Sequence, residues 1–208
     1  MAVGGRMEPE WLLDAYRHGV FPWPTGEDDP LLWWSPDPRC VMPLDGFKMS
    51  SRLRRRMRSG RFELTFDEDF AGVMYGCATG PGREDGTWIT RAIRTAYGRL
   101  HKLGHAHSVE TWLVEGAERR LVGGVYGVAV GGLFAAESMF HYETDASKVA
   151  LASLVQHLNE QGFRLLDIQQ WTAHTGSLGA VEVSREDYLD RLAGVVDLGV
   201  RFIGDDRG

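Results

Sequence analysis

The chain has 208 residues, 43% of them hydrophobic, and a formal net charge of −6. This is enough apolar material for a sizeable core, and the acidic balance excludes a general nucleic-acid coat. The longest uncharged apolar run, residues 121–136, contains five glycines and is a poor membrane span. No secretory signal is visible, and Cys40 and Cys77 offer no Cys-x-x-Cys metal spacing. We expect a reduced, cytoplasmic setting without membrane attachment.

The first elements in the chain are a short helix over residues 8–18 and a turn-rich stretch. Residues 20–40 contain so many prolines and tryptophans that they cannot be helical throughout. A boundary near Cys40 divides the chain into a small N-terminal domain, residues 1–40, and a larger domain, residues 41–208.

Two helices are predicted next. An arginine-rich helix over residues 50–59 is capped by Ser50 or Ser51 and ended by Gly60. Thr90 begins the other helix, whose apolar residues share one face. These residues are Ile93, Ala96, Tyr97 and Leu100.

The second half of the chain contains most of the predicted strands. The segments are residues 107–114, 121–130 and 133–140, and Gly131-Gly132 forms the last turn. They predict an antiparallel meander. Asp145 then caps an amphipathic helix that Gly162 ends, FRLLDIQ forms a strand, and Ser184 begins a last helix. The order predicts an α+β fold with a central, mostly antiparallel sheet.

A concentration of basic residues between positions 46 and 62 contains no acidic residue. Its members, the basic patch, are Lys48, Arg52, Arg54, Arg55, Arg56, Arg58 and Arg61. One interpretation is a solvated helix face paired with acidic neighbours. The favoured one is a defined phosphate footprint, because the charge leaves only Leu53 and Met57 for the core and its self-repulsion has no local relief.

Seven tryptophans are many for this length, and several lie in polar, turn-rich segments. Trp23 and Trp88 are two of these. Each tryptophan either anchors the core or offers a surface on which an unpaired base stacks, an interaction of ~1 to 3 kcal/mol per base. A basic patch with exposed aromatics suits a single-stranded nucleic-acid end better than a duplex.

Several segments carry a resemblance to a known family. They are AYRHGVFPWP, LLWWSPDPRCV, EDGTWIT, AYGRLHKLGHAHSVETW, LVGGVYGVAVGGLFAAESMF, SKVAL and LLDIQ followed by HTGSLGA. In order, from about Gly4 to about Leu192, the chain closely resembles the leucyl/phenylalanyl-tRNA-protein transferases of bacteria.

The resemblance implies an enzyme that moves Leu or Phe, less often Met, from tRNA onto proteins that begin with Arg or Lys, marking them for N-end-rule degradation. It implies a small N-terminal domain joined to a GCN5-related acetyltransferase-like domain, with no metal or CoA required. We expect a monomer.

The segment LLDIQ carries the predicted catalytic pair. Strand alternation places Asp167 and Gln169 on one face, where an acid and an amide are able to form a relay. The resemblance assigns both to catalysis, with Gln169 contacting the attacking amine and Asp167 polarising or orienting it. Whether Asp167 is a general base or a positioning group stays open.

Glu137 is an acid in an otherwise apolar strand, and burying it without a partner is costly. A structural arginine is one candidate partner. The resemblance instead places Glu137 in the site, holding an ammonium group of a substrate. Phe134 faces away from Glu137 in a regular strand, so a bulge or twist is required for both to line one pocket.

The resemblance also implies the binding residues for aminoacyl-adenosine. Val125, Phe134 and Leu166 line the amino-acid pocket, and Trp23 and Trp88 hold the terminal adenosine with Tyr16 and Tyr97 nearby. Members of the family often have Met where this chain has Val125. The smaller side chain enlarges the pocket, which favours bulkier substrates.

Three alternatives accompany this hypothesis. His105, His107 and Glu110 form a possible metal set, although packing or hydrogen-bonding histidines are commoner. A CoA-dependent acetyltransferase requires an Arg/Gln-x-x-Gly-x-Gly/Ala loop, which the chain lacks. An RNA-binding module without catalysis fits the Arg and Trp content alone.

Overall fold

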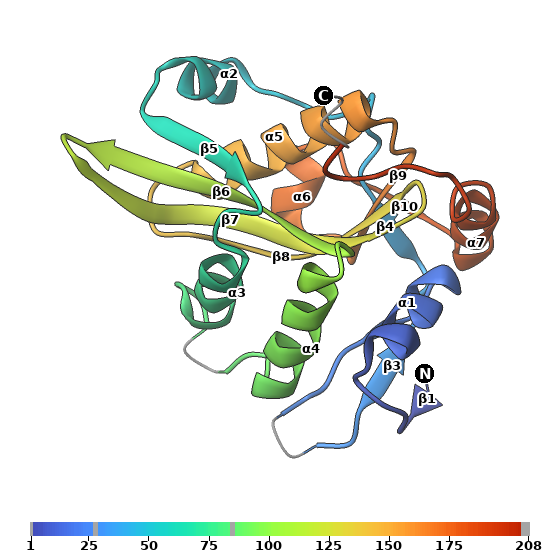
Figure 1. Cartoon of the computed structure of the whole chain (residues 1–208). Helices are drawn as coiled ribbons and strands as arrows, with labels where there is room; N and C mark the ends of the chain where they lie inside the picture. Colours follow the sequence, from blue (N-terminus) through green and yellow to red (C-terminus); the bar gives the residue numbers. More distant parts are fainter. Residues whose placement is uncertain (1, 27–28, 84–85, 205–208) are drawn as a thin grey trace.

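The computed structural model describes residues 2–26, 29–83 and 86–204. The N-terminal part holds helix α1 (Pro9–Arg17) and a small antiparallel sheet in the order β1-β3-β2. Its strands are β1 (Ala2–Val3), β2 (Phe21–Pro22) and β3 (Leu32–Trp34). This part lies beside the larger body, next to α4 (Figure 1).

A seven-stranded sheet in the order β10-β4-β9-β8-β7-β6-β5 forms the centre of the protein. The strands are β4 (Arg39–Val41), β5 (Phe62–Phe66), β6 (Ala106–Glu115), β7 (Glu118–Val130), β8 (Leu133–His141), β9 (Leu165–Gln169) and β10 (Val181–Val183). Only the β8–β9 pair is parallel in this sheet as described. The α+β class and the mostly antiparallel sheet are therefore confirmed.

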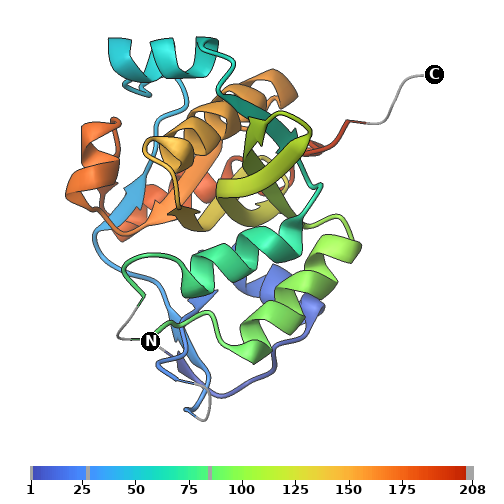
Figure 2. The same ribbon diagram turned by 90° about the vertical axis from the view of Figure 1, so that its left-hand side faces the viewer.

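Helices cover both faces of this sheet (Figures 1 and 2). They are α2 (Ser51–Arg58), α3 (Phe70–Thr79), α4 (Arg91–Lys102), α5 (Ala146–Gln161), α6 (Ala173–Ser177) and α7 (Arg185–Ala193). Helices α3 and α4 pack on one face with Tyr126 and Val128 of β7, whereas α5 packs on the other with Val125 and Phe134. Burial of alternate residues on opposite faces explains why β7 is apolar on both sides.

The predicted helix ends are mostly confirmed. Ser50, Thr90 and Ser184 each accept a hydrogen bond from a backbone N–H of the first turn. Asp145 also precedes its helix, α5, but its side chain makes no capping bond. Its carboxylate contacts α2 instead. The predicted start of the helix is therefore confirmed, but the predicted side-chain cap is wrong.

Helix α3 and the strands β4, β5 and β10 were not predicted from the sequence. Helix α3 is buried on several sides, including at Val73, Met74 and Cys77, so its sequence lacks a clear polar face. Strands β4 and β10 have three residues each, too few for alternation to show.

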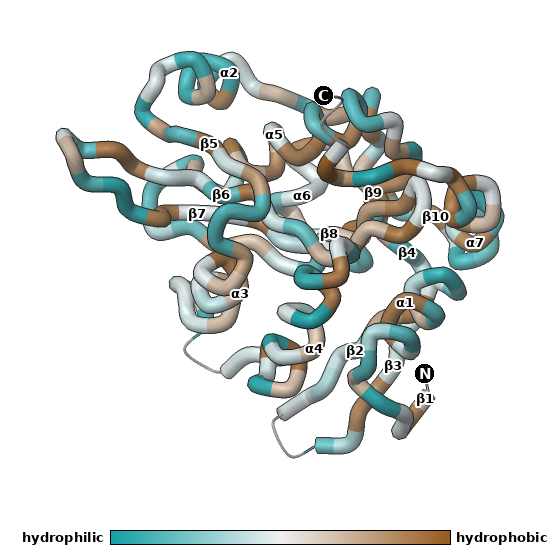
Figure 3. The backbone as a smooth tube through the Cα atoms, viewed as in Figure 1, coloured by the Kyte–Doolittle hydropathy of each residue, from teal (hydrophilic) through white to brown (hydrophobic). Residues whose placement is uncertain are grey.

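Hydrophilic residues dominate α2 (Figure 3). Leu53 is the buried residue of that helix, and Leu53 and Met57 both pack against the apolar cluster under α5. Among the described residues, no helix combines the length and apolar character that crossing a membrane requires.

Candidate active site

A cavity of about 490 Å³ opens where β8 and β9 separate. Their parallel pairing ends at Ala135 and Asp167, and β8 then continues while β9 stops at Gln169. The lining residues are Trp23, Arg83, Trp88, Val125, Ala136, Glu137, Ser138, Met139, Leu151, Ile168, Gln169, Gln170, Thr172, His174 and Thr175. Divergence of two paired strands leaves backbone and side chains of both free to face a ligand, so this is the natural place for a substrate.

Glu137 lies at a bulge on the wall of this cavity. Tyr126 pairs with Ser138 and Gly127 pairs with Ala136, so Glu137 is the extra residue between them. The bulge explains how the acid leaves the regular alternation of the strand and faces the cavity.

Hydroxyl and amide groups, rather than an arginine, contact the Glu137 carboxylate. The Tyr16 hydroxyl donates to it over 2.7 Å, the Tyr97 hydroxyl over 3.5 Å and the Gln169 amide nitrogen over 3.2 Å. No described cation forms an ion pair with it. Burial, followed by repulsion from Asp167, raises the pKa of Glu137 to about 8, against the lowering effect of the Tyr16 hydrogen bond.

Tyr16 and Tyr97 both contact the Glu137 carboxylate through their hydroxyl groups. Their hydroxyl oxygens are 2.5 Å apart, and both side chains are fully buried. Burial raises the pKa of each phenol well above its ordinary value, so both stay protonated and both keep a hydrogen to donate toward the carboxylate. The sequence-based prediction placed both tyrosines near the adenosine; the structure places them against Glu137.

Asp167 is completely buried, and it accepts hydrogen bonds from Arg39, Tyr188 and the backbone of Gln169. Arg39 Nε donates to Oδ1 over 2.9 Å, and the Tyr188 hydroxyl donates to Oδ2 over 2.9 Å. The backbone N–H of Gln169 also donates to Oδ1 over 2.9 Å. A carboxylate held in this way orients its neighbours, and Asp167 is not among the residues that line the cavity.

Arg39 and Tyr188 are site-supporting residues that the sequence analysis missed. The Arg39 guanidinium lies over the rings of Phe21 and Tyr188, 4.8 and 4.4 Å from their centres. Burial acts to lower the pKa of Arg39, but the adjacent Asp167 carboxylate outweighs it and raises that pKa. The available signal was an acid in the apolar segment LLDIQ, which requires a cation, but its sequence position does not reveal which one.

Gln169 has a positive φ of 56°, which interrupts the strand alternation assumed in the sequence analysis. The expected side-chain relay between Asp167 and Gln169 is not formed. Asp167 instead contacts the backbone N–H of Gln169, while the Gln169 amide points to Glu137. The carboxylate therefore fixes an unusual backbone conformation that presents the amide to the cavity.

Trp23 and Trp88 line the cavity, half-buried, and stack on each other with ring centres 5.5 Å apart. Val125 lines it as well. Phe134 and Leu166 do not: both are 1% exposed in the core under α5, despite the bulge at Glu137. The structure thus brings Val125 and the two indoles together and leaves Phe134 and Leu166 behind the cavity wall.

The basic patch is partly neutralised by the protein itself. Arg52 and Arg56 lie 3.2 and 3.7 Å from Asp145, and Arg61 lies 2.9 Å from Glu143. The expectation of unrelieved repulsion is wrong for these three, because the chain after β8 brings acids to α2. The remaining members are exposed and have no carboxylate partner among the described residues: Lys48, Arg54, Arg55 and Arg58.

The backbone connects the patch to the cavity. The N–H of Lys48 donates to the carbonyl of Leu178 over 2.7 Å, directly after α6. Thr172 and Thr175, at the start and in the middle of the same segment, line the cavity. The segment around α6 therefore joins the start of the patch to one wall of the cavity.

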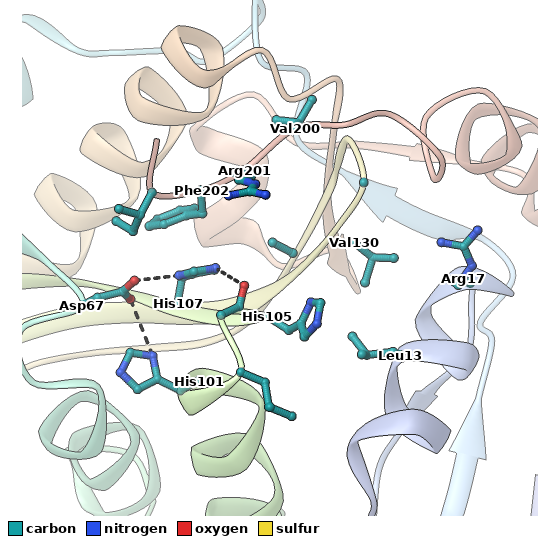
Figure 4. Close-up of a pocket in the computed structure, with 15 residues that line it drawn as sticks. Leu13, Arg17, Asp67, His101, His105, His107, Val130, Val200, Arg201 and Phe202 are labelled. Carbon is teal, nitrogen blue, oxygen red and sulfur yellow. Dashed lines mark hydrogen bonds and ion pairs between the residues drawn. The ribbon is translucent and has the colours of Figure 1, made fainter. Parts of the chain in front are cut away.

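A larger cavity of about 760 Å³ lies elsewhere, between α1, the β7–β8 turn and the C-terminal segment (Figure 4). It contains His105 and His107 of the alternative metal set. Both His107 ring nitrogens are engaged, 2.6 Å from an Asp67 carboxylate oxygen and 3.1 Å from the Gly104 carbonyl oxygen. Glu110 is buried and accepts hydrogen bonds from Thr65 and Ser108. These contacts favour hydrogen-bonding roles, and the described part of the chain holds no group of three suitable metal ligands.

Known proteins share both sequence and fold with this chain. A protein 52% identical over 193 residues, the leucyl/phenylalanyl-tRNA–protein transferase of Syntrophotalea carbinolica, matches 92% of this chain and 82% of its own length. That of Nitratidesulfovibrio vulgaris is 53% identical over 190 residues, matching 91% and 79%. The crystal structure of FemX has the same fold, with a TM-score of 0.55 at 12% identity, covering 85% of this chain and 66% of that one.

Two family models match consecutive parts of the sequence. Residues 5–37 match the N-terminal domain of leucyl/phenylalanyl-tRNA protein transferase, and residues 41–193 match the leucyl/phenylalanyl-tRNA protein transferase family itself. The predicted resemblance is confirmed, and with it the class of enzyme. The chain belongs to the leucyl/phenylalanyl-tRNA protein transferase family, whose members are aminoacyltransferases.

Proposed function

We propose that this protein transfers Leu or Phe, less often Met, from aminoacyl-tRNA to acceptor proteins that begin with Arg or Lys, which marks them for N-end-rule degradation. The observation that carries the proposal is the cavity between β8 and β9, which joins an apolar wall to the half-buried carboxylate of Glu137. The family membership of the chain supports the reaction class. The protein acts as a monomer in the cytoplasm, with residues 1–40 as a small domain beside the catalytic one.

The adenine and the amino-acid side chain of aminoacyl-adenosine require different surfaces, and the cavity has an aromatic surface for one and an apolar wall for the other. The terminal adenine stacks on the half-buried indoles of Trp23 and Trp88. The Leu or Phe side chain lies against Val125, where an apolar wall discriminates only ~1 to 3 kcal/mol per methylene. Phe134 and Leu166 support this wall from behind.

Glu137 serves as both the anchor and the proton acceptor for an ammonium group. An α-amino group has a pKa near ~7.7, close to the value of about 8 for Glu137. Below about pH 8 the free carboxyl is mostly protonated, and the nearby ammonium of the acceptor favours its ionised form, which attracts that ammonium and takes one proton from it. Similar pKa values make this transfer nearly free of cost in either direction.

Bond formation then follows from positioning. The free amine attacks the ester carbonyl carbon, a C–N bond forms, and the C–O bond to the ribose breaks. The second proton on nitrogen passes to the ribose oxygen, and Glu137 later releases its proton to water. Gln169 orients the amine through its amide, while Asp167 positions Gln169 through the backbone N–H.

The basic patch holds the tRNA body during this reaction. Its four exposed cations without described carboxylate partners face solvent at and before α2, and the segment around α6 leads from them to the cavity. Counterion release from tRNA favours binding there at moderate salt.

Turnover of charged tRNA tests the proposal. Labelled Leu-tRNA is incubated with a peptide that begins with Arg, and a peptide that begins with Glu serves as the control. Label moves to the Arg peptide if the protein is a transferase. Label that stays on tRNA despite binding identifies an RNA-binding module without catalysis. Asp167→Ala and Gln169→Ala are expected to lose turnover far more than tRNA affinity, whereas equal losses in both would make them binding residues.

A further inference from the structure

Arg83 and His174 lie at the junction of two cavities. Both line the active-site cavity, and both line a neighbouring cavity of about 200 Å³. Arg83 follows α3, whereas His174 belongs to α6, so elements far apart in the sequence bring two basic side chains to one place. The proposed reaction uses neither of them.

Two hydrogen bonds fix the direction of the Arg83 side chain. Its Nε donates to the Cys77 carbonyl over 3.1 Å, and one terminal nitrogen donates to the Ser138 hydroxyl over 3.3 Å. These bonds hold the half-buried guanidinium beside the cavity and leave further N–H donors for a ligand. A held guanidinium loses little conformational entropy when it binds a planar or tetrahedral anion.

Other basic groups surround the same point. Burial lowers the pKa of His174, and repulsion from Lys148 and His141 lowers it further. His141 also lines the smaller cavity. Among the residues that the structure describes, no carboxylate lies within ion-pair distance of Arg83, His141, Lys148 or His174. The cations Arg83 and Lys148 thus lie near His174 without a carboxylate partner among the described residues.

We propose that Arg83 and His174 bind the phosphate that joins the terminal adenosine of tRNA to the preceding nucleotide. This inference rests on the proposed function and extends it to the phosphodiester backbone. Trp88 and Arg83 line the same cavity, so an adenine stacked on the indoles places its 5′ phosphate near the basic cluster. The guanidinium donates to the phosphate oxygens, and the His174 imidazole donates one N–H.

The assignment separates this cluster from the basic patch. The patch around α2 is exposed and contacts the backbone of the tRNA body through charge alone. The Arg83 cluster is half-buried and acts on one phosphate at a fixed distance from the reacting ester. We therefore expect its effect with a single nucleotide, where the patch has nothing to bind.

The test uses non-hydrolysable 3′-aminoacylamino-3′-deoxyadenosine, with and without a 5′-phosphate, as competitive inhibitors of Leu transfer from tRNA. With wild-type protein the phosphorylated inhibitor is expected to bind roughly tenfold more tightly, the effect of one hydrogen bond to a charged group. In Arg83→Gln the ratio of the two inhibition constants falls to about one. Arg99→Gln, an exposed change on α4 that lines neither cavity, is the control and keeps the wild-type ratio.

The outcomes are distinguishable. Equal inhibition by both compounds in the wild type overturns the phosphate site and leaves the proposed function standing, as does an unchanged ratio in Arg83→Gln. Absence of inhibition by either compound while tRNA is turned over also overturns it, because the terminal nucleotide is then not recognised by itself. Failure to transfer Leu from tRNA at all refutes the proposed function instead. If Arg83→Gln does not fold, His174→Gln tests the same ratio, which is expected to fall in part.

Discussion

Arg39 and Asp167 form an ion pair that is closed to solvent on both sides, with 1% and 0% of the two side chains exposed. The strands that carry them, β4 and β9, are neighbours in the sheet although 128 residues separate the pair. Tyr188 of α7 completes the arrangement by donating to Asp167 and stacking under Arg39. The pair anchors the end of β9, and so it fixes the position of Gln169 at the cavity.

Breaking this pair is expected to be costly. Arg39→Met leaves the Asp167 carboxylate buried without a cation, which is expected to lower the free energy of unfolding by about 3–5 kcal/mol. The combined variant Arg39→Met with Asp167→Leu removes both charges and is expected to recover most of that loss in urea denaturation. The double variant remains inactive, because the backbone N–H of Gln169 no longer has its acceptor. Recovery of turnover along with stability would refute the positioning role of Asp167.

The backbone conformation of Gln169 is expected to lower the stability of the protein while it supports activity. Its φ of 56° costs a residue with a side chain about 1 kcal/mol or more compared with glycine. Gln169→Gly and Gln169→Ala both remove the amide and are expected to lose turnover. The glycine variant unfolds at a higher urea concentration than the alanine variant, since only glycine relieves the strain. Equal midpoints for the two variants would show that the backbone relaxes when the amide is removed.

The raised pKa of Glu137 makes stability depend on pH in a defined direction. Below the ordinary carboxyl pKa of 4.5, both the folded and the unfolded states are protonated. Between there and about 8, the folded protein retains a proton that the unfolded chain has released, so the free energy of unfolding falls as pH rises.

Glu137→Gln removes this dependence. We expect the urea midpoint of the variant, relative to wild type, to increase steadily as the pH is raised from about 5.5 to about 8, and to level off above that range. A constant difference across the whole range would mean that Glu137 does not take up a proton on folding.

Two sets of substitutions in the basic patch test its role in tRNA binding. Neutralising Arg54, Arg55 and Arg58, which lack described carboxylate partners, is expected to raise the KM for tRNA and flatten its salt dependence, with a change in slope of roughly 0.7–0.9 for each phosphate that the variant no longer neutralises. Neutralising Arg52 and Arg56, which Asp145 already pairs, is expected to have a smaller effect. Measuring the KM for tRNA from about 50 to about 200 mM salt distinguishes the two variants. Equal salt slopes in the wild type and both variants would refute tRNA binding by the patch.

Val125 is expected to influence the choice between Leu and Phe. It lines the cavity, and Val125→Met adds volume to the wall that we propose contacts the aminoacyl side chain. We expect the ratio of kcat/KM for Phe-tRNA over Leu-tRNA to fall by about tenfold, which lies within the range for one or two methylenes in an apolar pocket. Competition between the two charged tRNAs measures this ratio directly. An unchanged ratio would place the side-chain pocket away from Val125.

Elements whose signals are local could be predicted from the residue order alone. Thr90, Ser50 and Ser184 begin their helices because a side-chain oxygen followed by an apolar period is sufficient to define a helix start. The long strands β6, β7 and β8 were also predicted, because glycine turns and runs of apolar and β-branched residues are local features of the sequence. The family segments indicated Glu137, Asp167 and Gln169 as site residues.

Which of these groups meet depends on the packing of the whole chain. No local pattern indicates that Arg39 pairs with Asp167, that Tyr16 and Tyr97 contact Glu137, or that Asp145 serves α2 instead of its own helix. The bulge at Glu137 and the positive φ of Gln169 also defeat strict strand alternation, and they are what turn both side chains toward the cavity. The physical reason is that only the complete fold determines which charged groups lose their contact with water. A buried charge then pairs with whichever group the packing brings to it, however distant in sequence.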